Sequence, residues 1–291
     1  MVRRLSPFVL PIALLAAACA PSDDEAPATQ GAANAAPAGP RVAFAPTAED
    51  ALPAAVLGTA PPPAGTAVHY FAQDTTTTGY LAVPEGEGPF PALILIHEWN
   101  GLGDRVRQVA DALAAEGYIA LAADLYSGRT GSNPDENVAL MTEVNDDPAT
   151  MIANLNAAVT FLRARPDVTG RIGAMGWCFG GGVALSFGLD GENHDATAIF
   201  YGRLIDDPAR LASLSHEIYG TFAGLDQGIS REQVDGFARA LREAGIPNDI
   251  HIYDDVQHGF WLWVDRDPDA LTAPALDAWQ RLKAYLARTL R

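Results

Sequence analysis

Residues 171–181, RIGAMGWCFGG, contain the pattern that decides the fold of this chain. The stretch RIGAM has the composition of a short buried strand, and a helix is predicted to follow from Gly182. Cys178 lies at the junction, with Gly176 two residues before it and Gly180 two residues after it. This is the strand–turn–helix setting of a nucleophile elbow, G-x-S-x-G, with cysteine in place of serine. The glycines are needed because neighbouring side chains would clash in so tight a turn.

Cys178 is therefore predicted to be a nucleophile. The start of the following helix offers backbone N–H groups and the positive end of the helix dipole, which favour a thiolate. The alternative is a small buried side chain, which is the usual role of a free cysteine. We favour the nucleophile because the flanking glycines and the strand-to-helix position are what an elbow requires.

A cysteine nucleophile needs a base, and the base needs an acid that orients it. Asp226 follows a predicted strand at 218–223, and His258 follows another at 249–253. Both lie where the carboxyl ends of parallel strands bring loops together. Their order along the chain, acid before histidine, is the order found with this type of elbow. The alternative for Asp226 is a turn former, which is a common role of aspartate.

Strands and helices alternate along the chain. The strands are predicted at 91–96, 118–122, 171–175, 197–201, 218–223 and 249–253. The helices are predicted at 104–116, 150–165, 182–189, 230–244 and 274–290. This alternation predicts an α/β fold, a mostly parallel sheet covered by helices on both faces.

The N-terminus predicts export. Residues 1–19 have two arginines, then an apolar stretch too short to span a bilayer, then small residues before Cys19. This order is similar to a bacterial lipoprotein signal, in which Cys19 carries the lipid, and a cleaved secretory peptide is the alternative. We expect a periplasmic or cell-envelope protein that contacts the membrane only through this anchor.

Residues 20–66 are predicted to be a disordered tether, and residues 67–291 a single domain. Alanine, proline and glycine dominate the first segment, and nine of the chain's 21 prolines lie between Pro21 and Pro63. Such a segment has little apolar surface to bury.

The composition excludes several classes of protein. The 291 residues include 19 Lys and Arg against 36 Asp and Glu, a net charge of −17, which argues against nucleic acid as a partner. Two cysteines are too few for a disulfide scaffold or a cysteine-based zinc finger. A zinc motif H-E-x-x-H beginning at His97 fails because Gly101 stands where the second histidine should be. We expect no metal and no organic cofactor, and the oligomeric state stays open.

Several separated motifs together resemble the dienelactone hydrolases of the α/β-hydrolase superfamily. The resemblance runs from about Gly79 to the C-terminus and includes HEWNG at 97–101, ADLY at 123–126, the elbow, Asp226 and HGF at 258–260. It implies an α/β-hydrolase fold and a Cys-His-Asp triad. Such a triad hydrolyses a small-molecule ester or lactone through an acyl-thioester intermediate.

The resemblance also implies roles for three neighbouring residues. A glutamate matching Glu98 lies beside the thiol and controls its ionisation, and the backbone N–H groups of Phe179 and Trp99 form the oxyanion hole. Physically, a buried carboxylate would retain the thiol's proton until substrate displaces it. A solvated loop charge is the alternative for Glu98.

The substrate is expected to differ from dienelactone, whose carboxylate is held by two arginines in enzymes that act on it. Gly128 stands at one of these positions with Arg129 next to it, and Leu262 stands at the other. Trp261 and Trp263 flank Leu262, which predicts an apolar wall. An ester, lactone or thioester with an apolar acyl group fits these residues.

Two other functions compete with hydrolysis. The chain could be a non-catalytic binding or scaffold lipoprotein that keeps the hydrolase fold. A redox role for Cys178 is the second, and it is weakened because the sequence offers no resolving cysteine nearby.

Overall fold

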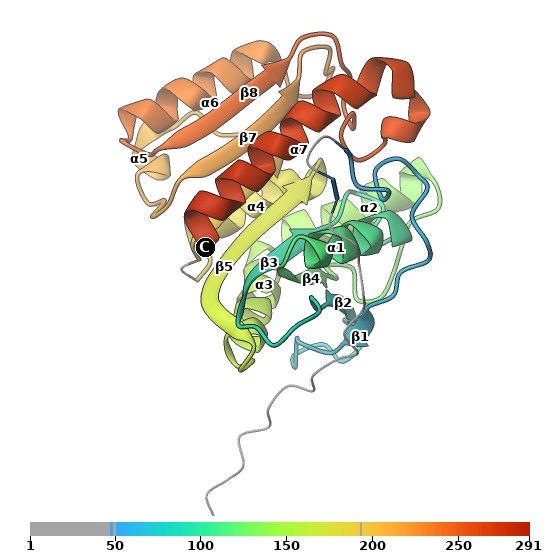
Figure 1. Cartoon of the computed structure of the whole chain (residues 1–291). Coiled ribbons are helices and arrows are strands. Elements are labelled where there is room, and N and C mark those ends of the chain that lie inside the picture. Colours follow the sequence, from blue (N-terminus) through green and yellow to red (C-terminus); the bar gives the residue numbers. More distant parts are fainter. Residues whose placement is uncertain (1–46, 49–50, 193) are drawn as a thin grey trace, which may run out of the picture. The chain divides into compact units, whose positions relative to one another are not determined.

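The computed structural model describes residues 47–48, 51–192 and 194–291. Within these residues one sheet has the strand order β1-β2-β4-β3-β5-β6-β7-β8 (Figure 1). The strands are β1 (Thr66–Val68), β2 (Gly79–Ala82), β3 (Phe90–Ile96), β4 (Ile119–Ala123), β5 (Val168–Trp177), β6 (Ala196–Phe200), β7 (Ile218–Ala223) and β8 (Asn248–Tyr253). β2 pairs antiparallel with β1 and β4, whereas the pairs from β4 to β8 are parallel.

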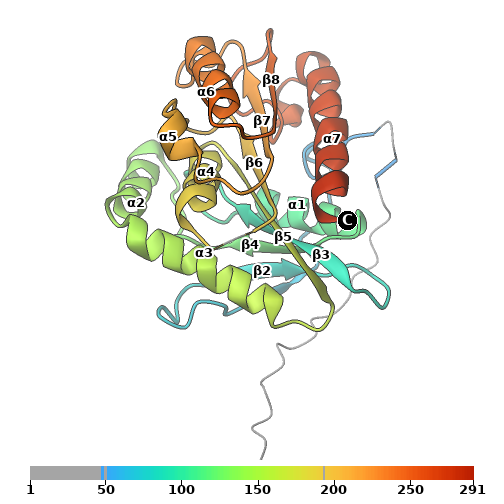
Figure 2. The same ribbon diagram turned by 90° about the vertical axis from the view of Figure 1, so that its left-hand side faces the viewer.

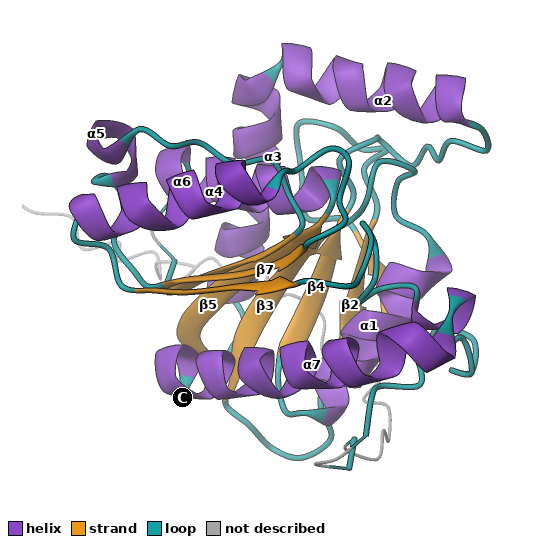
Figure 3. Cartoon of the chain, turned by 90° about the horizontal axis from the view of Figure 1, so that it is seen from above, coloured by secondary structure: helices purple, strands orange, loops and turns teal. Residues whose placement is uncertain are grey.

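Helices cover both faces of this sheet. They are α1 (Asp104–Ala115), α2 (Pro134–Asp146), α3 (Pro148–Arg163), α4 (Phe179–Asp190), α5 (Pro208–Leu211), α6 (Arg231–Glu243) and α7 (Pro268–Leu290), with a 3₁₀ turn η1 (Val264–Arg266). α1 and α7 lie on one face, and α3, α4 and α6 on the other (Figure 3). The predicted mostly parallel sheet with helices on both faces is confirmed. No helix in the described ranges combines the length and apolar character needed to cross a membrane.

The core explains the continuous apolar runs of the central strands. Successive strand residues point to opposite faces, so Leu93 and Leu95 pack with α1 and α7, and Ile94 and Ile96 pack with α3 and α4. All four side chains are fully buried. A strand with both faces covered has no solvent-facing positions. The alternation of apolar and polar residues that is typical of a half-exposed strand is therefore absent.

The N-terminal boundary of the domain differs from the prediction. Leu52, Ala55 and Val56 are buried in the core on the α1 side of the sheet, and β1 begins at Thr66. The Ala64 N–H donates to a carboxylate oxygen of Asp111 on α1 at 3.0 Å. The prediction of an extended tether is thus wrong for residues 51–66, because a few apolar side chains among the prolines are enough to dock this segment. Residues 1–19 and most of the predicted tether lie outside the described residues.

Two helices differ from the prediction: α2 was not predicted, and α7 begins earlier than predicted. α2 has few apolar side chains to bury, so it lacks the helical periodicity that predicts a helix. It is separated from α3 by Asp147 alone and turns away from it (Figure 2). α7 begins at Pro268 rather than at Pro274, because Asp267 caps its start and Pro268 occupies the first turn, where proline is tolerated.

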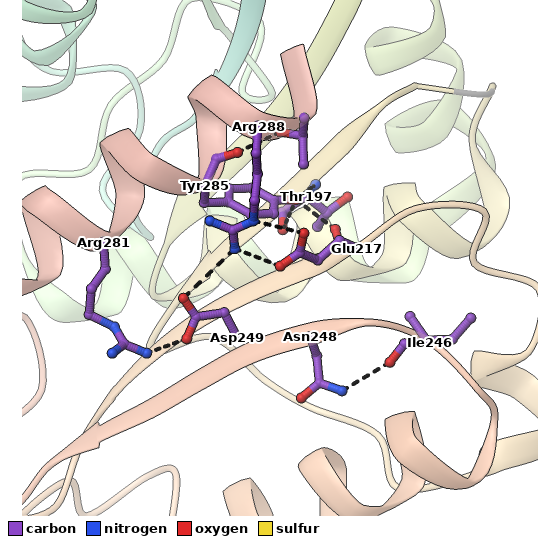
Figure 4. Close-up of polar contacts among 9 residues, drawn as sticks. Thr197, Glu217, Ile246, Asn248, Asp249, Arg281, Tyr285 and Arg288 are labelled. Carbon is purple, nitrogen blue, oxygen red and sulfur yellow. Dashed lines mark hydrogen bonds and ion pairs between the residues drawn. The ribbon is translucent and has the colours of Figure 1, made fainter. Parts of the chain in front are cut away.

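Polar contacts fasten the C-terminal helix α7 to the ends of three strands (Figure 4). The buried Tyr285 hydroxyl donates to the Glu217 carbonyl at 2.6 Å and accepts from the Thr197 N–H at 2.8 Å. Arg288 donates through Nε and Nη2 to the Glu217 carboxylate, at 3.0 and 2.6 Å, and lies 3.9 Å from Asp249. Tyr285 therefore satisfies two backbone groups at once, whereas the more exposed charge pairs contribute little.

Replacing Tyr285 by Phe leaves the Thr197 N–H and the Glu217 carbonyl without this partner. Since buried unsatisfied polar groups are costly, Tyr285→Phe should lower the free energy of unfolding by ~1–3 kcal/mol, measured by urea denaturation. Tyr118→Phe is the control, because the Tyr118 hydroxyl has no hydrogen-bond partner among the described residues. An equal loss of stability in both variants would contradict this role of Tyr285.

Candidate active site

Cys178 occupies a strained turn between β5 and α4. Its backbone angles are φ 57° and ψ −119°, a conformation that side-chain-bearing residues rarely adopt. A Cβ on Gly176 would overlap the carbonyl of Gly180, and a Cβ on Gly180 would overlap the carbonyl of Ile96 at the end of β3. The turn can form only because both positions are glycine. It leaves the Phe179 N–H in the first turn of α4, where N–H groups have no acceptor within the helix.

The structure brings Asp226 and His258 together beside this turn. Asp226 follows β7, and its Oδ2 accepts a hydrogen bond from His258 Nδ1 at 2.6 Å. Its Oδ1 accepts from the N–H groups of Gly228 at 2.8 Å and Ile229 at 3.2 Å. His258 and Cys178 line the same two cavities, and the interaction between them contributes to the raised pKa of His258. The three side chains thus form a continuous chain of contacts from carboxylate to imidazole to thiol.

The charge state of this chain of contacts follows from its geometry. Burial opposes protonation of His258, but its hydrogen bond with Asp226 and its interaction with Cys178 outweigh burial and raise its pKa to about 10. Burial also opposes ionisation of Asp226, but hydrogen bonds from His258 and the Gly228 N–H outweigh it and lower the pKa of Asp226. At neutral pH the imidazole therefore carries a proton that it can donate.

The loop after β3 is held by a second set of contacts. His97 is completely buried, and burial lowers its pKa, so it is neutral. Its Nδ1 donates to the Glu98 carbonyl at 2.6 Å, while its Nε2 accepts from the Leu125 N–H at 3.3 Å. The Tyr126 hydroxyl donates to the Trp99 carbonyl at 3.0 Å. These bonds set the backbone direction at Trp99, whose N–H is the second predicted oxyanion donor.

Glu98 is buried and points toward Trp263. Trp263 Nε1 donates to Glu98 Oε2 at 2.8 Å, and Arg105 and Arg266 stack on the Trp263 ring with their guanidinium carbons at 4.6 and 4.5 Å from its centre. Burial raises the pKa of Glu98, and the Trp263 bond and the positive charges of His258, Arg266 and Arg105 act against this rise. The solvated loop charge considered as an alternative is thus excluded, because the side chain is buried.

Two cavities in the described part of the chain share Cys178 and His258. The apolar cavity measures about 740 Å³. Its wall includes Met141, Met151, Val183, Leu185, Leu204 and Ile229, with the exposed Arg203. The polar cavity measures about 580 Å³. Its wall includes Glu98, Asn100, Ser132, Asn137, Trp263 and Arg266. A substrate whose reacting carbonyl lies at Cys178 would extend into both.

Three residues predicted to bind substrate lie elsewhere. Trp261 and Leu262 are fully buried in the core, where Trp261 stacks on Trp177 at 5.9 Å between ring centres. Arg129 is paired with Glu143 at 2.8 Å and lines neither cavity. The prediction of an apolar wall at Trp261 and Leu262 is therefore wrong, because the chain after His258 turns those side chains into the core.

Two other residues of the site, Tyr201 and Asn137, were not predicted from the sequence. Tyr201, at the end of β6, lines the apolar cavity and packs edge-on against the His258 ring at 4.9 Å. Its position as the last residue of the strand predicted at 197–201 could have indicated it. Asn137 comes from α2, which was not predicted. The described residues contain no group of three or more His, Cys, Asp or Glu side chains placed to hold a metal ion.

An elbow cysteine beside a His–Asp pair on this sheet is the arrangement expected of an α/β hydrolase. Comparisons with known proteins identify the family. The sequence profile of the dienelactone hydrolase family matches residues 77–290. A relative from Methylorubrum extorquens, named "Putative carboxymethylenebutenolidase", is 31% identical over 228 residues, which cover 73% of this chain and 77% of the relative.

Solved structures show the same fold. One named "Putative Dienelactone Hydrolase", from Klebsiella pneumoniae, has a TM-score of 0.68 at 24% identity and covers 77% of this chain and 98% of its own. An esterase from Thermogutta terrifontis has a TM-score of 0.58 at 17% identity and covers 78% and 92%. The chain belongs to the dienelactone hydrolase family, and both the predicted family and the predicted α/β-hydrolase fold are confirmed. Its class of activity is the hydrolysis of ester or lactone bonds.

The Trp263 bond should influence the ionisation of Glu98. Trp263→Phe removes the indole N–H that stabilises the carboxylate, so the pKa of Glu98 should rise further above its ordinary value. Carboxyl ¹³C NMR titration of the labelled protein measures this directly. Trp279→Phe, which alters a core tryptophan outside both cavities, is the control and should leave the Glu98 titration unchanged. A Glu98 pKa unaffected by Trp263→Phe would show that the bond has no electrostatic role.

Proposed function

We propose that this chain hydrolyses carboxylic ester or lactone bonds with Cys178 as nucleophile, His258 as acid and base, and Asp226 as the residue that orients His258. The observation that carries this proposal is the strained Cys178 in contact with the Asp226–His258 pair, where two cavities meet. The positive φ of Cys178 has a free-energy cost, because residues with side chains rarely adopt it. The glycines on either side leave room for this conformation. Strain of this kind is typical of a side chain held for chemistry.

Acylation is the first half of the proposed reaction. The Cys178 thiolate, with protonated His258 as its counter-ion, attacks the carbonyl carbon and forms the C–S bond. The N–H groups of Phe179 and Trp99 donate to the oxygen that becomes negative. As the tetrahedral intermediate collapses, the C–O bond breaks and the departing alkoxide takes the proton from His258. An acyl-thioester on Cys178 and an alcohol remain.

Deacylation returns the enzyme to its starting state. His258, now neutral, removes a proton from a water molecule that attacks the thioester carbonyl. The same two N–H groups stabilise the second oxyanion, and the C–S bond breaks. The carboxylic acid leaves, Cys178 is again a thiolate and His258 again carries the proton. Asp226 keeps its charge throughout and stabilises the imidazolium at both stages.

Glu98 is proposed to control the thiol. It is buried in the wall of the same cavity as Cys178 and His258, with Trp263 as its partner. Burial raises its pKa, so the neutral carboxyl forms more readily here than in solvent. Substrate in the polar cavity would change the surroundings of this carboxyl and, through it, the balance between thiol and thiolate.

The substrate is proposed to carry an apolar acyl group and to differ from dienelactone. The apolar cavity provides a wall of aliphatic and methionine side chains for such a group. Neither Leu262, in the core, nor Arg129, paired with Glu143, is available to hold a carboxylate. An ester or lactone with an aliphatic acyl chain fits the apolar cavity best.

Removing the nucleophile tests the proposal. Cys178→Ala should lower kcat/KM for the hydrolysis of propyl hexanoate by at least about a thousandfold, with an unchanged circular dichroism spectrum. His258→Gln should have a comparable effect. His251→Gln is the matched control, because His251 lies on β8 outside both cavities, and it should retain turnover. Hydrolysis that survives in Cys178→Ala would end the case for a cysteine hydrolase.

We also propose that the protein is exported and anchored to a membrane by lipid on Cys19. This proposal rests on the sequence of residues 1–19, which lie outside the described residues. A periplasmic or cell-envelope location follows from it.

Lipidation has a direct test. Cys19→Ser should move the expressed protein from the membrane fraction to the soluble fraction, because the thioether-linked lipid can no longer be attached. Cys178→Ser, which keeps the other cysteine, should stay with the membrane. If the unchanged protein is already soluble, it is simply secreted and carries no anchor.

A further inference from the structure

Asn137 on α2 is a buried amide without a partner. Its side chain is 7% exposed, and its Oδ1 has no hydrogen-bond partner. Within the described ranges no hydrogen bond reaches its side chain, whereas its backbone N–H donates to the Asn133 carbonyl at 3.0 Å. A buried amide left unsatisfied costs about 1–3 kcal/mol. Such a group calls for an explanation, and in the wall of a cavity a ligand that completes its hydrogen bonds is one.

The position of Asn137 in the wall of the polar cavity indicates that the ligand is the substrate. It lines the polar cavity together with Cys178 and His258, although it comes from a helix that packs on the rest of the domain through few side chains. Gly131, in the same wall, has no Cβ, and a Cβ there would overlap Asn137 Oδ1. The glycine therefore makes room for the amide at this position.

The two cavities differ in polarity, so they suit different parts of an ester substrate. The apolar cavity accepts a hydrocarbon chain, whereas the polar cavity has Asn100, Ser132, Asn137 and Arg266 in its wall. A hydroxyl group both donates and accepts a hydrogen bond, so it satisfies an asparagine amide in either orientation. An alkyl group in the same place would leave the amide unsatisfied.

We propose that Asn137 is a substrate-binding residue that hydrogen-bonds to a hydroxyl group on the alcohol half of the ester. The substrate class is then an ester of an aliphatic acid with a polyhydroxylated alcohol, its acyl chain in the apolar cavity. This inference rests on the proposed hydrolase function and adds to it the nature of the alcohol.

Two esters with the same acyl group test it. The purified protein is assayed with propyl hexanoate and with 2,3-dihydroxypropyl hexanoate, which differ only in two hydroxyl groups on the alcohol. The unchanged protein should have the higher kcat/KM for the dihydroxypropyl ester. Asn137→Leu, similar in size but apolar, should lose about tenfold in kcat/KM for that ester and stay within about twofold for propyl hexanoate.

A stability measurement separates binding from a structural role. Because Asn137→Leu removes an unsatisfied buried amide, its Tm should equal or exceed that of the unchanged protein. Thr142→Ala, on the exposed side of the same helix, is the control. It should change neither the preference in kcat/KM for the dihydroxypropyl ester over propyl hexanoate nor the Tm. If Asn137→Leu folds poorly, Asn137→Ala provides the same comparison of the two esters.

The outcomes distinguish this inference from the proposed function. If the unchanged protein hydrolyses neither this pair nor other esters or lactones, the proposed function fails. If it hydrolyses both esters without preferring the dihydroxypropyl ester, or if the Asn137 variants lose both activities equally, the hydrolase stands and the role of Asn137 is overturned. If both Asn137 variants lose their fold, the residue is structural and the inference is also wrong.

Discussion

The backbone of Cys178, held at φ 57°, is the constraint on which the rest of the site depends. The conformation exists because Gly176 and Gly180 leave room for each other and for the carbonyl of Ile96. It places Cys178 between the end of β5 and the start of α4, in the walls of both cavities. The first N–H groups of α4 have no acceptor within the helix. The free-energy cost of this strained backbone is compensated by the packing of the core on both faces of the sheet. A side chain on either glycine would therefore disturb the chemistry and the packing together.

Around the cysteine, the site is assembled from the ends of several strands, each held by its own polar contacts. Neutral His97 directs the loop with Glu98 and Trp99, because it accepts from one backbone group and donates to another. Asp226 holds His258 with one oxygen while backbone N–H groups occupy the other. Each reacting group thus has its direction set before a substrate arrives, which is the condition for electrostatic catalysis.

Much of this could be predicted from the sequence. The elbow glycines and the buried strands indicated the sheet, and the order of Asp226 and His258 along the chain placed both at the correct edge. The docked segment at Leu52–Val56 could not be predicted, because it is stabilised by packing against α1 rather than by its own composition. Leu262 was misplaced because a residue's distance along a loop does not reveal on which side its side chain falls. Asn137 was missed because α2 has little apolar periodicity.

Trapping the covalent intermediate tests the central claim most directly. The protein is mixed with excess 2,3-dihydroxypropyl hexanoate, quenched in acid within milliseconds, digested, and analysed by mass spectrometry. The account predicts a hexanoyl group on the peptide that contains Cys178, which disappears as turnover ends and is removed by hydroxylamine, as expected of a thioester. Turnover without any acylated peptide, or acylation of another residue in its place, would contradict the account.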